Sequence, residues 1–457
     1  MPRTIETPAA TSQSLAHAVD SLMPQLTQEL AELVRIPSIS AAGFPAEPMD
    51  TAYNLVIEFL RDAGVRDIDR LDLPDTYPII TANIAAPPGA PTVLLYSHYD
   101  VVPAGDESKW TTPPFQPTER HGALYGRGAS DSKANVMAIV GMLKAWGGKP
   151  PVGIKVVIEG QEEVGSAFNT YPPVDPERFR CDAMLIEDMG SVRPGVPTLT
   201  VALRGTGVCT IELRTLGGPK HSGQYGGAAP DALIALVHAL ASLHDEKGNV
   251  AVKGLRREKW TGASIKEEEF RELAEVGRNL PLFGTGGLGE RVWSGPAITI
   301  TGLDSASVAK AVNAVVPYAR AKLNLRVHPE QNADEALEAL VKHFKGLRPF
   351  GLSLEVKKEA TGNGFAAKTS GPAYDAAKAA LSTAWGGETI FVATGGSIPL
   401  VNALHAAVPK AEILLLGATD GFSNIHAPNE RVMLDEFKKT VVAGADFFRE
   451  YAARWKG

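Results

Sequence analysis

The chain has 457 residues, of which 44% are hydrophobic and 21% are charged, and its formal net charge is −7. This size and balance are typical of a soluble globular protein of two or three domains. The sequence has no long basic run, which argues against a nucleic-acid partner, because phosphate binding needs clustered Lys and Arg. No apolar stretch approaches the ~20 residues that span a bilayer, so no membrane contact is predicted.

The first residues and the cysteines indicate the compartment. The N-terminal segment MPRTIETPAATSQS lacks the apolar core of a signal peptide. Cys181 and Cys209 are too few for a disulfide framework, and neither has a Cys or His at zinc-finger spacing. We therefore expect a cytoplasmic protein with both thiols reduced.

The first part of the chain alternates helix and strand signals. Apolar residues recur at helical spacing over 14–35 and 51–64, and another helix begins near 131. Strand-like apolar runs occupy 79–84, 92–97, 154–159 and 183–187. Strands that alternate with helices predict an α/β fold with a mostly parallel sheet covered by helices on both faces.

The pattern changes near residue 205. Strands are expected over 207–215, 297–301, 321–327 and 352–357, and helices over 231–243, 305–315 and 334–344. The helices at 231–243 and 334–344, together with about four strands, predict a small α+β domain of ferredoxin-like kind. An apolar strand at 412–416 and a long helix at 434–455 then resume the first pattern. We therefore predict one α/β domain, residues 1–204 and 370–457, interrupted by an inserted domain, residues 205–369.

Five polar residues lie where the α/β pattern predicts a shared edge of the sheet. They are His98, Asp131, Glu163, Asp188 and His426. Four of them follow strand-like apolar runs, and the fifth, Asp131, opens a helix. Each has a plainer reading alone: Asp131 as a helix cap, Glu163 as an exposed carboxylate, and His426 as a loop histidine. Glu187, next to Asp188, is an equally good candidate.

Taken together, the five residues predict a metal site. Imidazole and carboxylate ligands suit Zn, Mn or Co better than Cu(I) or iron–sulfur clusters. Five ligands are too many for one tetrahedral zinc, but they fit two metals if one carboxylate bridges them. Asp100, two residues after His98, can accept the second ring N–H of that histidine.

Seven motifs in this order resemble a known family. They are SHYDVVP (97–103), KWTTPPFQPTERHGALYGRGASDSK (109–133), EGQEEVGS (159–166), KHSGQYGG (220–227), NLRVHP (324–329), GGSIP (395–399) and IHAPNE (425–430). The chain resembles the co-catalytic dinuclear metallopeptidases that include carnosinase, glutamate carboxypeptidase, aminoacylase and succinyl-diaminopimelate desuccinylase. The ED-M pattern at 187–189 is most similar to the carnosinase-like dipeptidases.

The resemblance implies a role for each residue of the site. Asp131 would bridge two divalent ions, with zinc preferred over Mn or Co. His98 and Asp188 would complete the coordination of one metal, and Glu163 and His426 that of the other. Asp100 would orient His98, and Glu162 would be the general base for a water between the ions. A cis peptide is implied between Asp131 and Ser132. Dipeptidase-type members use Asp at position 188, whereas carboxypeptidase and deacylase types use Glu.

The inserted domain would act as a lid and dimerisation domain. His221 would stabilise the oxyanion in the site of a partner subunit, which implies a homodimer. Arg326, Gly396, Ser397 and Asn313 would bind the C-terminal carboxylate of a small peptide. The implied activity is metal-dependent hydrolysis of dipeptides or short peptides. An N-acyl amino acid deacylase or carboxypeptidase on the same scaffold, and a binding protein without catalysis, remain as alternatives.

Overall fold

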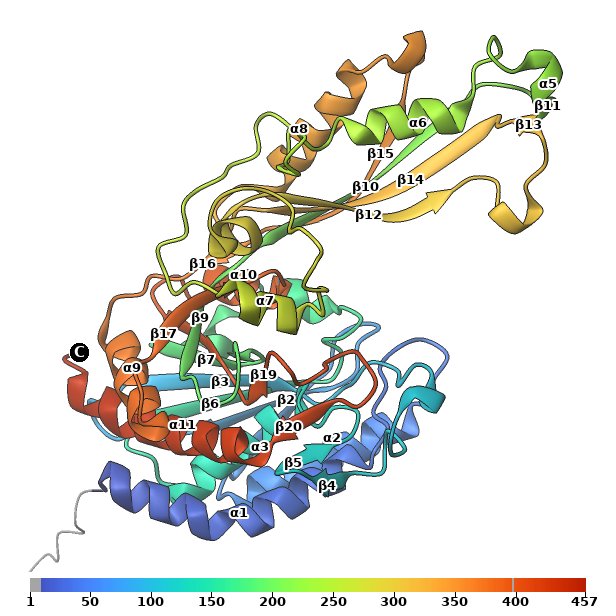
Figure 1. Cartoon of the computed structure of the whole chain (residues 1–457). Coiled ribbons are helices and arrows are strands. Elements are labelled where there is room, and N and C mark those ends of the chain that lie inside the picture. Colours follow the sequence, from blue (N-terminus) through green and yellow to red (C-terminus); the bar gives the residue numbers. More distant parts are fainter. Residues whose placement is uncertain (1–9, 397) are drawn as a thin grey trace, which may run out of the picture. The chain divides into compact units, whose positions relative to one another are not determined.

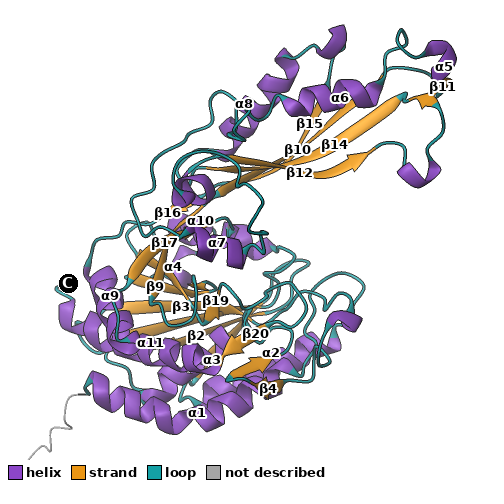
Figure 2. Cartoon of the chain, viewed as in Figure 1, coloured by secondary structure: helices purple, strands orange, loops and turns teal. Residues whose placement is uncertain are grey.

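The computed structural model describes residues 10–396 and 398–457, and the chain divides into two compact units. The first lies within residues 1–201, 367–391 and 403–457, and the second within 202–366 and 392–402. Each unit has its own hydrophobic core. Figure 1 gives the course of the chain, and Figure 2 the distribution of helices and strands.

A mixed β-sheet forms the centre of the first unit. Its strand order is β1-β2-β6-β3-β7-β18-β9-β16, with β17 also paired to β9. The strands are β1 (Asp67–Leu71), β2 (Ile79–Ile84), β3 (Thr92–His98), β6 (Gly153–Glu159), β7 (Ala183–Glu187), β9 (Thr198–Leu203), β16 (Phe365–Ala366), β17 (Ile390–Thr394) and β18 (Glu412–Leu416). The four central strands, β6-β3-β7-β18, are parallel, and antiparallel pairs flank them. The parallel centre has the continuous apolar runs of a doubly covered sheet.

Five helices share the main core with this sheet. They are α1 (Ser12–Val34), α2 (Glu47–Asp62), α3 (Lys133–Ala145), α9 (Pro372–Trp385) and α11 (Leu434–Arg454). Helix α3 packs against both α1 and α11. Every residue of α3 from Lys133 to Leu143 is buried. A helix enclosed by its neighbours on all sides needs no polar face.

Short strands bring distant loops of the first unit together. Strand β20 (Arg431–Met433) pairs with β5 (Ala123–Tyr125), which pairs with β4 (Thr118–Arg120). Strand β19 (Thr419–Asp420) runs parallel to β8 (Gly190–Ser191). The β20–β5 pair places the loop before α3 beside the loop that precedes β20.

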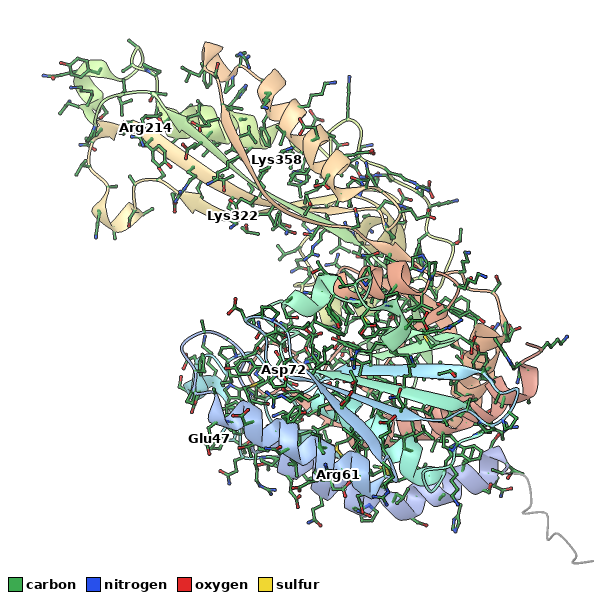
Figure 3. All side chains as sticks on the ribbon, turned by 180° about the vertical axis from the view of Figure 1, so that it is seen from behind. Glu47, Arg61, Asp72, Arg214, Lys322 and Lys358 are labelled. Carbon is green, nitrogen blue, oxygen red and sulfur yellow. The ribbon has the colours of Figure 1, made fainter. Side chains whose placement is uncertain are left out.

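The second unit contains an antiparallel sheet of order β12-β14-β10-β15. These strands are β10 (Gly205–Arg214), β12 (Ala297–Asp304), β14 (Tyr318–Val327) and β15 (Glu355–Gly362). Helices α6 (Ala232–Ala241) and α8 (Ala333–Gly346) pack on its apolar face. The chain order β-α-β-β-α-β is that of the predicted ferredoxin-like domain. On the other face, Lys322 pairs with Glu359, whereas Lys358 pairs with Glu338 of α8 (Figure 3).

One element of the second unit was predicted wrongly. Residues 305–315 do not form the expected helix. They contain a 3₁₀ turn, Val308–Lys310, and the two-residue strand β13 (Ala314–Val315), which pairs with β11 (Lys220–His221). Val308 and Val312 are both exposed, so their helical spacing is not matched by burial. Helical spacing predicts a helix only where a core covers the apolar face.

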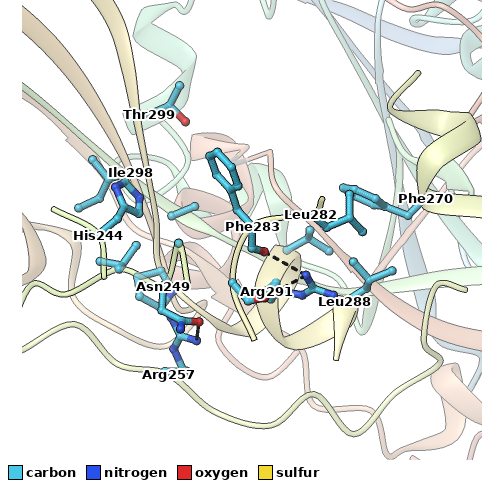
Figure 4. A pocket seen from close by; sticks show the side chains of 16 residues that line it. His244, Asn249, Arg257, Phe270, Leu282, Phe283, Leu288, Arg291, Ile298 and Thr299 are labelled. Atoms are coloured by element: carbon cyan, nitrogen blue, oxygen red, sulfur yellow. Dashed lines mark hydrogen bonds between the residues drawn. The ribbon is translucent and has the colours of Figure 1, made fainter. Parts of the chain in front are cut away.

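The segment between α6 and β12 encloses a cavity of about 280 Å³ (Figure 4). Its lining is mainly apolar and includes Phe270, Leu282, Leu288 and Ile298. Within this segment, Nη1 of Arg291 donates to the backbone oxygen of Phe283 at 3.0 Å. The cavity therefore belongs wholly to the second unit.

Candidate metal centre

All five predicted metal ligands lie in the first unit, on segments that meet at one edge of its sheet. His98 is the last residue of β3, and Asp188 directly follows β7. Glu163 lies in the loop after β6, Asp131 in the loop before α3, and His426 in the loop before β20. The carboxyl ends of parallel strands share an edge, so side chains distant in sequence converge there.

Asp131 lies between two pairs of side chains. Its Oδ1 is 3.2 Å from Nε2 of His98, which is also 3.2 Å from Oδ1 of Asp188. Its Oδ2 is 3.1 Å from Nε2 of His426, which is 3.0 Å from Oε2 of Glu163. The result is two groups of three side chains that share one carboxylate, each close enough to hold a metal ion.

Asp100 determines which nitrogen of His98 faces the cluster. Nδ1 of His98 lies 3.2 Å from Oδ1 of Asp100 and 3.1 Å from its backbone oxygen. Nδ1 therefore carries the proton, and the lone pair of Nε2 points at two carboxylate oxygens. That arrangement is repulsive unless a proton or a cation lies between them. Asp100 also accepts from the backbone N–H groups of Glu162 and Glu163, each at 3.1 Å.

The carboxylates of the site are buried and repel one another. Burial, together with the charge of Asp188, raises the pKa of Glu162 to about 9. Burial also raises the pKa of Glu163 to about 7, although a hydrogen bond with His426 opposes the rise. The pKa of Asp188 is likewise raised, mainly by burial. Oε1 of Glu163 is buried and has no partner among the described residues. A divalent cation would supply the missing charge, and the N and O donors fit one.

The loop that carries Asp131 is held by a residue that we did not single out from the sequence. The peptide between Asp131 and Ser132 is cis, which confirms the prediction from the resemblance. Glu430 is fully buried and accepts from the backbone N–H groups of Ser130 and Asp131, at 3.0 and 2.9 Å. Arg127 donates to the same carboxylate at 2.5 Å. Arg127 and Glu430 both lie inside quoted motifs, but nothing in the sequence pairs them.

The family model for peptidase family M20/M25/M40 matches residues 94–450, a range that includes all five candidate ligands. The chain belongs to this family. The match confirms the resemblance, the α/β fold class, and the prediction of a metal-dependent hydrolase. Enzymes of this family use divalent metals, and the two ligand groups around Asp131 are where this chain could hold them.

Several relatives of this M20 chain are similar over almost its whole length. The cysteinylglycine-S-conjugate dipeptidase of Corynebacterium striatum is 38% identical, covering 93% of this chain and 95% of its own. The Cys-Gly metallodipeptidase of Saccharomyces cerevisiae is 29% identical, with 96% and 98% covered. The crystal structure of human carnosine dipeptidase 1 superposes with a TM-score of 0.81 at 26% identity, and 98% and 100% of the two chains are covered.

Asp188 and Glu187 occupy very different surroundings. Asp188 faces His98 within the cluster. Glu187 is fully buried, and neither of its carboxylate oxygens has a partner among the described residues. Burial raises the pKa of Glu187 to about 8. The geometry therefore supports Asp188 as the ligand, in agreement with the dipeptidase pattern.

The other predicted site residues belong to the second unit. His221 and Asn313 are exposed neighbours, since the N–H of Ser222 donates to the backbone oxygen of Asn313 at 2.9 Å. Arg326 is half-buried on β14, and its side chain has no hydrogen bond or ion pair with any described residue. Gly396 follows β17 and is exposed. Ser397 lies outside the described residues.

No helix within residues 10–396 and 398–457 combines the length and the apolar character that crossing a membrane requires. Cys181 and Cys209 are both free and buried, as expected for reduced thiols.

Proposed function

We propose that this chain is a dinuclear metallo-dipeptidase that hydrolyses dipeptides or short peptides with a free C-terminal carboxylate. The observation that carries the proposal is the position of Asp131, whose two oxygens each face a separate His–carboxylate pair. His98 and Asp188 would hold one ion and Glu163 and His426 the other, with Asp131 shared. Zinc is the metal that we favour, with Mn and Co as alternatives.

The ions would polarise the scissile carbonyl and make water more acidic. Glu162 takes the proton of the attacking water and passes it to the leaving amine when the C–N bond breaks. Burial favours the protonated form that Glu162 must hold between these two steps, and the charge of the two ions would oppose the rise in its pKa and keep the carboxylate available as a base. Asp100 keeps Glu162 in place through the backbone N–H.

The second unit would supply the remaining groups. Arg326, which lacks a carboxylate partner among the described residues, binds the C-terminal carboxylate with Gly396, Ser397 and Asn313. His221 donates to the oxyanion of the tetrahedral intermediate in the site of a second copy. Nδ1 of His221 accepts from the N–H of Gly223 at 3.1 Å, so Nε2 carries the proton that is donated.

Exposed apolar residues support a homodimer through the second unit. Ile234 and Val237 of α6 are 60% and 52% exposed. Ile300 and Leu303 are 47% and 52% exposed on β12, which lies at an edge of the four-stranded sheet. An unpaired edge strand beside apolar side chains is suited to pairing with a second chain.

A cytoplasmic location stays a prediction.

Chelation followed by metal add-back tests the activity. The restored enzyme should cleave Cys-Gly and β-Ala-His type dipeptides faster than N-acetyl amino acids, because Asp188 and not Glu187 faces His98. Faster cleavage of N-acetyl amino acids would favour a deacylase, and activity on neither panel would favour a binding protein.

Mixing two inactive variants tests the dimer. Chains with His221→Ala and chains with Glu162→Gln should regain activity when mixed, because a mixed dimer contains one complete site. Unmixed variants at the same total concentration are the control. Mixtures that form dimers but stay inactive would rule out the action of His221 in trans.

A further inference from the structure

Arg204 is a buried cation with no carboxylate partner among the described residues. It directly precedes β10 and is only 5% exposed. Its Nη1 donates to the backbone oxygen of Val292 at 2.8 Å and its Nη2 to that of Gly295 at 2.7 Å. Nε is buried and has no partner among the described residues. Buried charges are usually paired with an opposite charge, and here two carbonyl dipoles are the only compensation that the described part of the chain provides.

The Arg204 side chain spans the strand ends where Arg326 lies. Arg326 of β14 is paired in register with Thr206 of β10 on one side and with Ala297 of β12 on the other. Arg204 lies two residues before Thr206, and Gly295, which it binds, lies two residues before Ala297. The guanidinium therefore links the starts of both strands that flank Arg326.

The two arginines affect each other electrostatically. Burial, followed by the nearby charge of Arg326, lowers the pKa of Arg204 to about 10. Neither guanidinium pairs with a carboxylate among the described residues. Two partly desolvated like charges repel, and an anion bound beside them would relieve that repulsion.

The backbone of Arg204 is also connected to the Gly396 loop. Its N–H donates to the backbone oxygen of Thr394 at 3.2 Å. Thr394 is the last residue of β17 and leads directly into Gly395 and Gly396. Arg204 is thus bonded to the strand that leads into Gly396 and to the segment that leads into β12, the neighbour of the strand that carries Arg326.

We propose that Arg204 is a positioning residue of the substrate-carboxylate receptor, where it fixes Arg326 and the Gly396 loop and adds a second positive charge behind them. The inference rests on the proposed function. It implies that the receptor binds ligands with a full negative charge at the C-terminus more tightly than neutral C-terminal amides or esters. A uniform structural role is the alternative, since Arg204 also binds the backbone of Val292, one of the residues that line the cavity in Figure 4.

The test compares a dipeptide with its C-terminal amide on the metal-loaded full chain. Arg204→Met should raise KM for the free dipeptide about tenfold, equivalent to about 1.4 kcal/mol, and change kcat less than twofold. KM for the amide should stay unchanged. Arg204→Lys should recover about half of the loss on a logarithmic scale, because it restores the charge. Thermal melting of both variants shows whether they fold. If Arg204→Met does not fold, the KM values of Arg204→Lys decide between the two roles.

Arg291→Met is the matched control. Arg291 lies on the segment that Arg204 binds, and it also donates to backbone carbonyls, those of Phe283 and Gly284. Its loss should leave the ratio of KM values for dipeptide and amide unchanged. Equal losses on both substrates in the Arg204 variants, or the same shift in Arg291→Met, would overturn the inference. A wild-type enzyme that cleaves no dipeptide would instead refute the proposed function, so the two failures are distinguishable.

Discussion

The carboxylate of Glu430 accepts a hydrogen bond from the backbone N–H of Asp131 at 2.9 Å, across 299 positions of the chain. The same carboxylate accepts from Arg127, Gly128 and Ser130. Glu430 lies four residues after His426, so this contact ties the loop of the shared ligand to the loop of a second ligand. The preorganisation of the metal centre therefore depends on a residue that does not itself belong to the ligand set.

Replacing Glu430 should weaken metal binding and folding together. Glu430→Ala leaves the buried Arg127 without its partner, which costs about 3–5 kcal/mol. It also frees the Asp131 loop, so metal affinity should fall about 10–100-fold. Urea unfolding and competition with a chelating dye measure the two effects. Glu29→Ala, which breaks the Lys144 ion pair on α1 and α3, is the control and should leave metal affinity intact. Normal metal affinity in Glu430→Ala would show that the hydrogen bonds of Glu430 to the Asp131 loop are not needed for metal binding.

Glu162→Gln should separate catalysis from metal binding. The amide cannot take a proton from water, so kcat should fall about 10²–10⁴-fold. Metal content should remain near that of the wild type, because the side chain lies outside both ligand groups. Glu163→Gln provides the contrast, since it should lose metal as well as activity. A Glu162→Gln enzyme with a near-normal rate would eliminate this residue as the base.

Asp188 and Glu187 can be distinguished by metal content. Asp188→Asn should lose metal, because its Oδ1 faces Nε2 of His98. Glu187→Gln should keep its metal, because neither carboxylate oxygen of Glu187 has a hydrogen-bond partner in the cluster or elsewhere among the described residues. Elemental analysis of the purified variants gives the answer. The opposite result would make Glu187 the ligand and would favour the deacylase alternative.

Glu159 should make the metal-free protein less stable as the pH rises. Burial raises its pKa to about 7, from an ordinary value of 4.5. A raised folded-state pKa means that the native state binds the proton more tightly. The stabilisation that protonated Glu159 contributes is complete below about pH 4.5 and is lost as the pH rises through about 7. Urea unfolding with chelator present should show this slope between pH 5 and 8. Glu159→Gln should reduce the slope, and Glu162, Glu163 and Glu187, whose pKa values are also raised, should account for the remainder. The exposed Glu119→Gln should leave the slope unchanged.

Removing the metal should abolish activity and lower the melting temperature. Metal that binds only the folded state stabilises it by about 2.7 kcal/mol at one hundred times its Kd. Excess EDTA should therefore shift the melting transition downward, and Zn, Mn or Co added back should restore both readouts to different degrees. An Asp131→Ala variant should show no shift with EDTA, because the shared ligand is gone. Full activity after exhaustive chelation would contradict the metal mechanism.

The sequence by itself determined most of the secondary structure and the chemical identity of the site. Apolar runs predicted the central strands, and ligand-type residues stood directly after them at His98 and Asp188. Both signals are local, because strand formation depends on neighbouring residues and ligand chemistry depends on the residue type. The motif order then identified the family, since each motif is a short continuous stretch.

Only the tertiary structure decided how these residues are paired. It divided the oxygens of Asp131 between His98 and His426. It also placed Asp188 in the cluster and left the carboxylate of Glu187 with no hydrogen-bond partner within residues 10–396 and 398–457. It also showed the contacts of Glu430 and Arg204, which no local pattern announces. Such contacts join segments far apart in the chain, and their geometry follows from how sheet, helices and loops pack around one another and not from the residues that adjoin them in sequence.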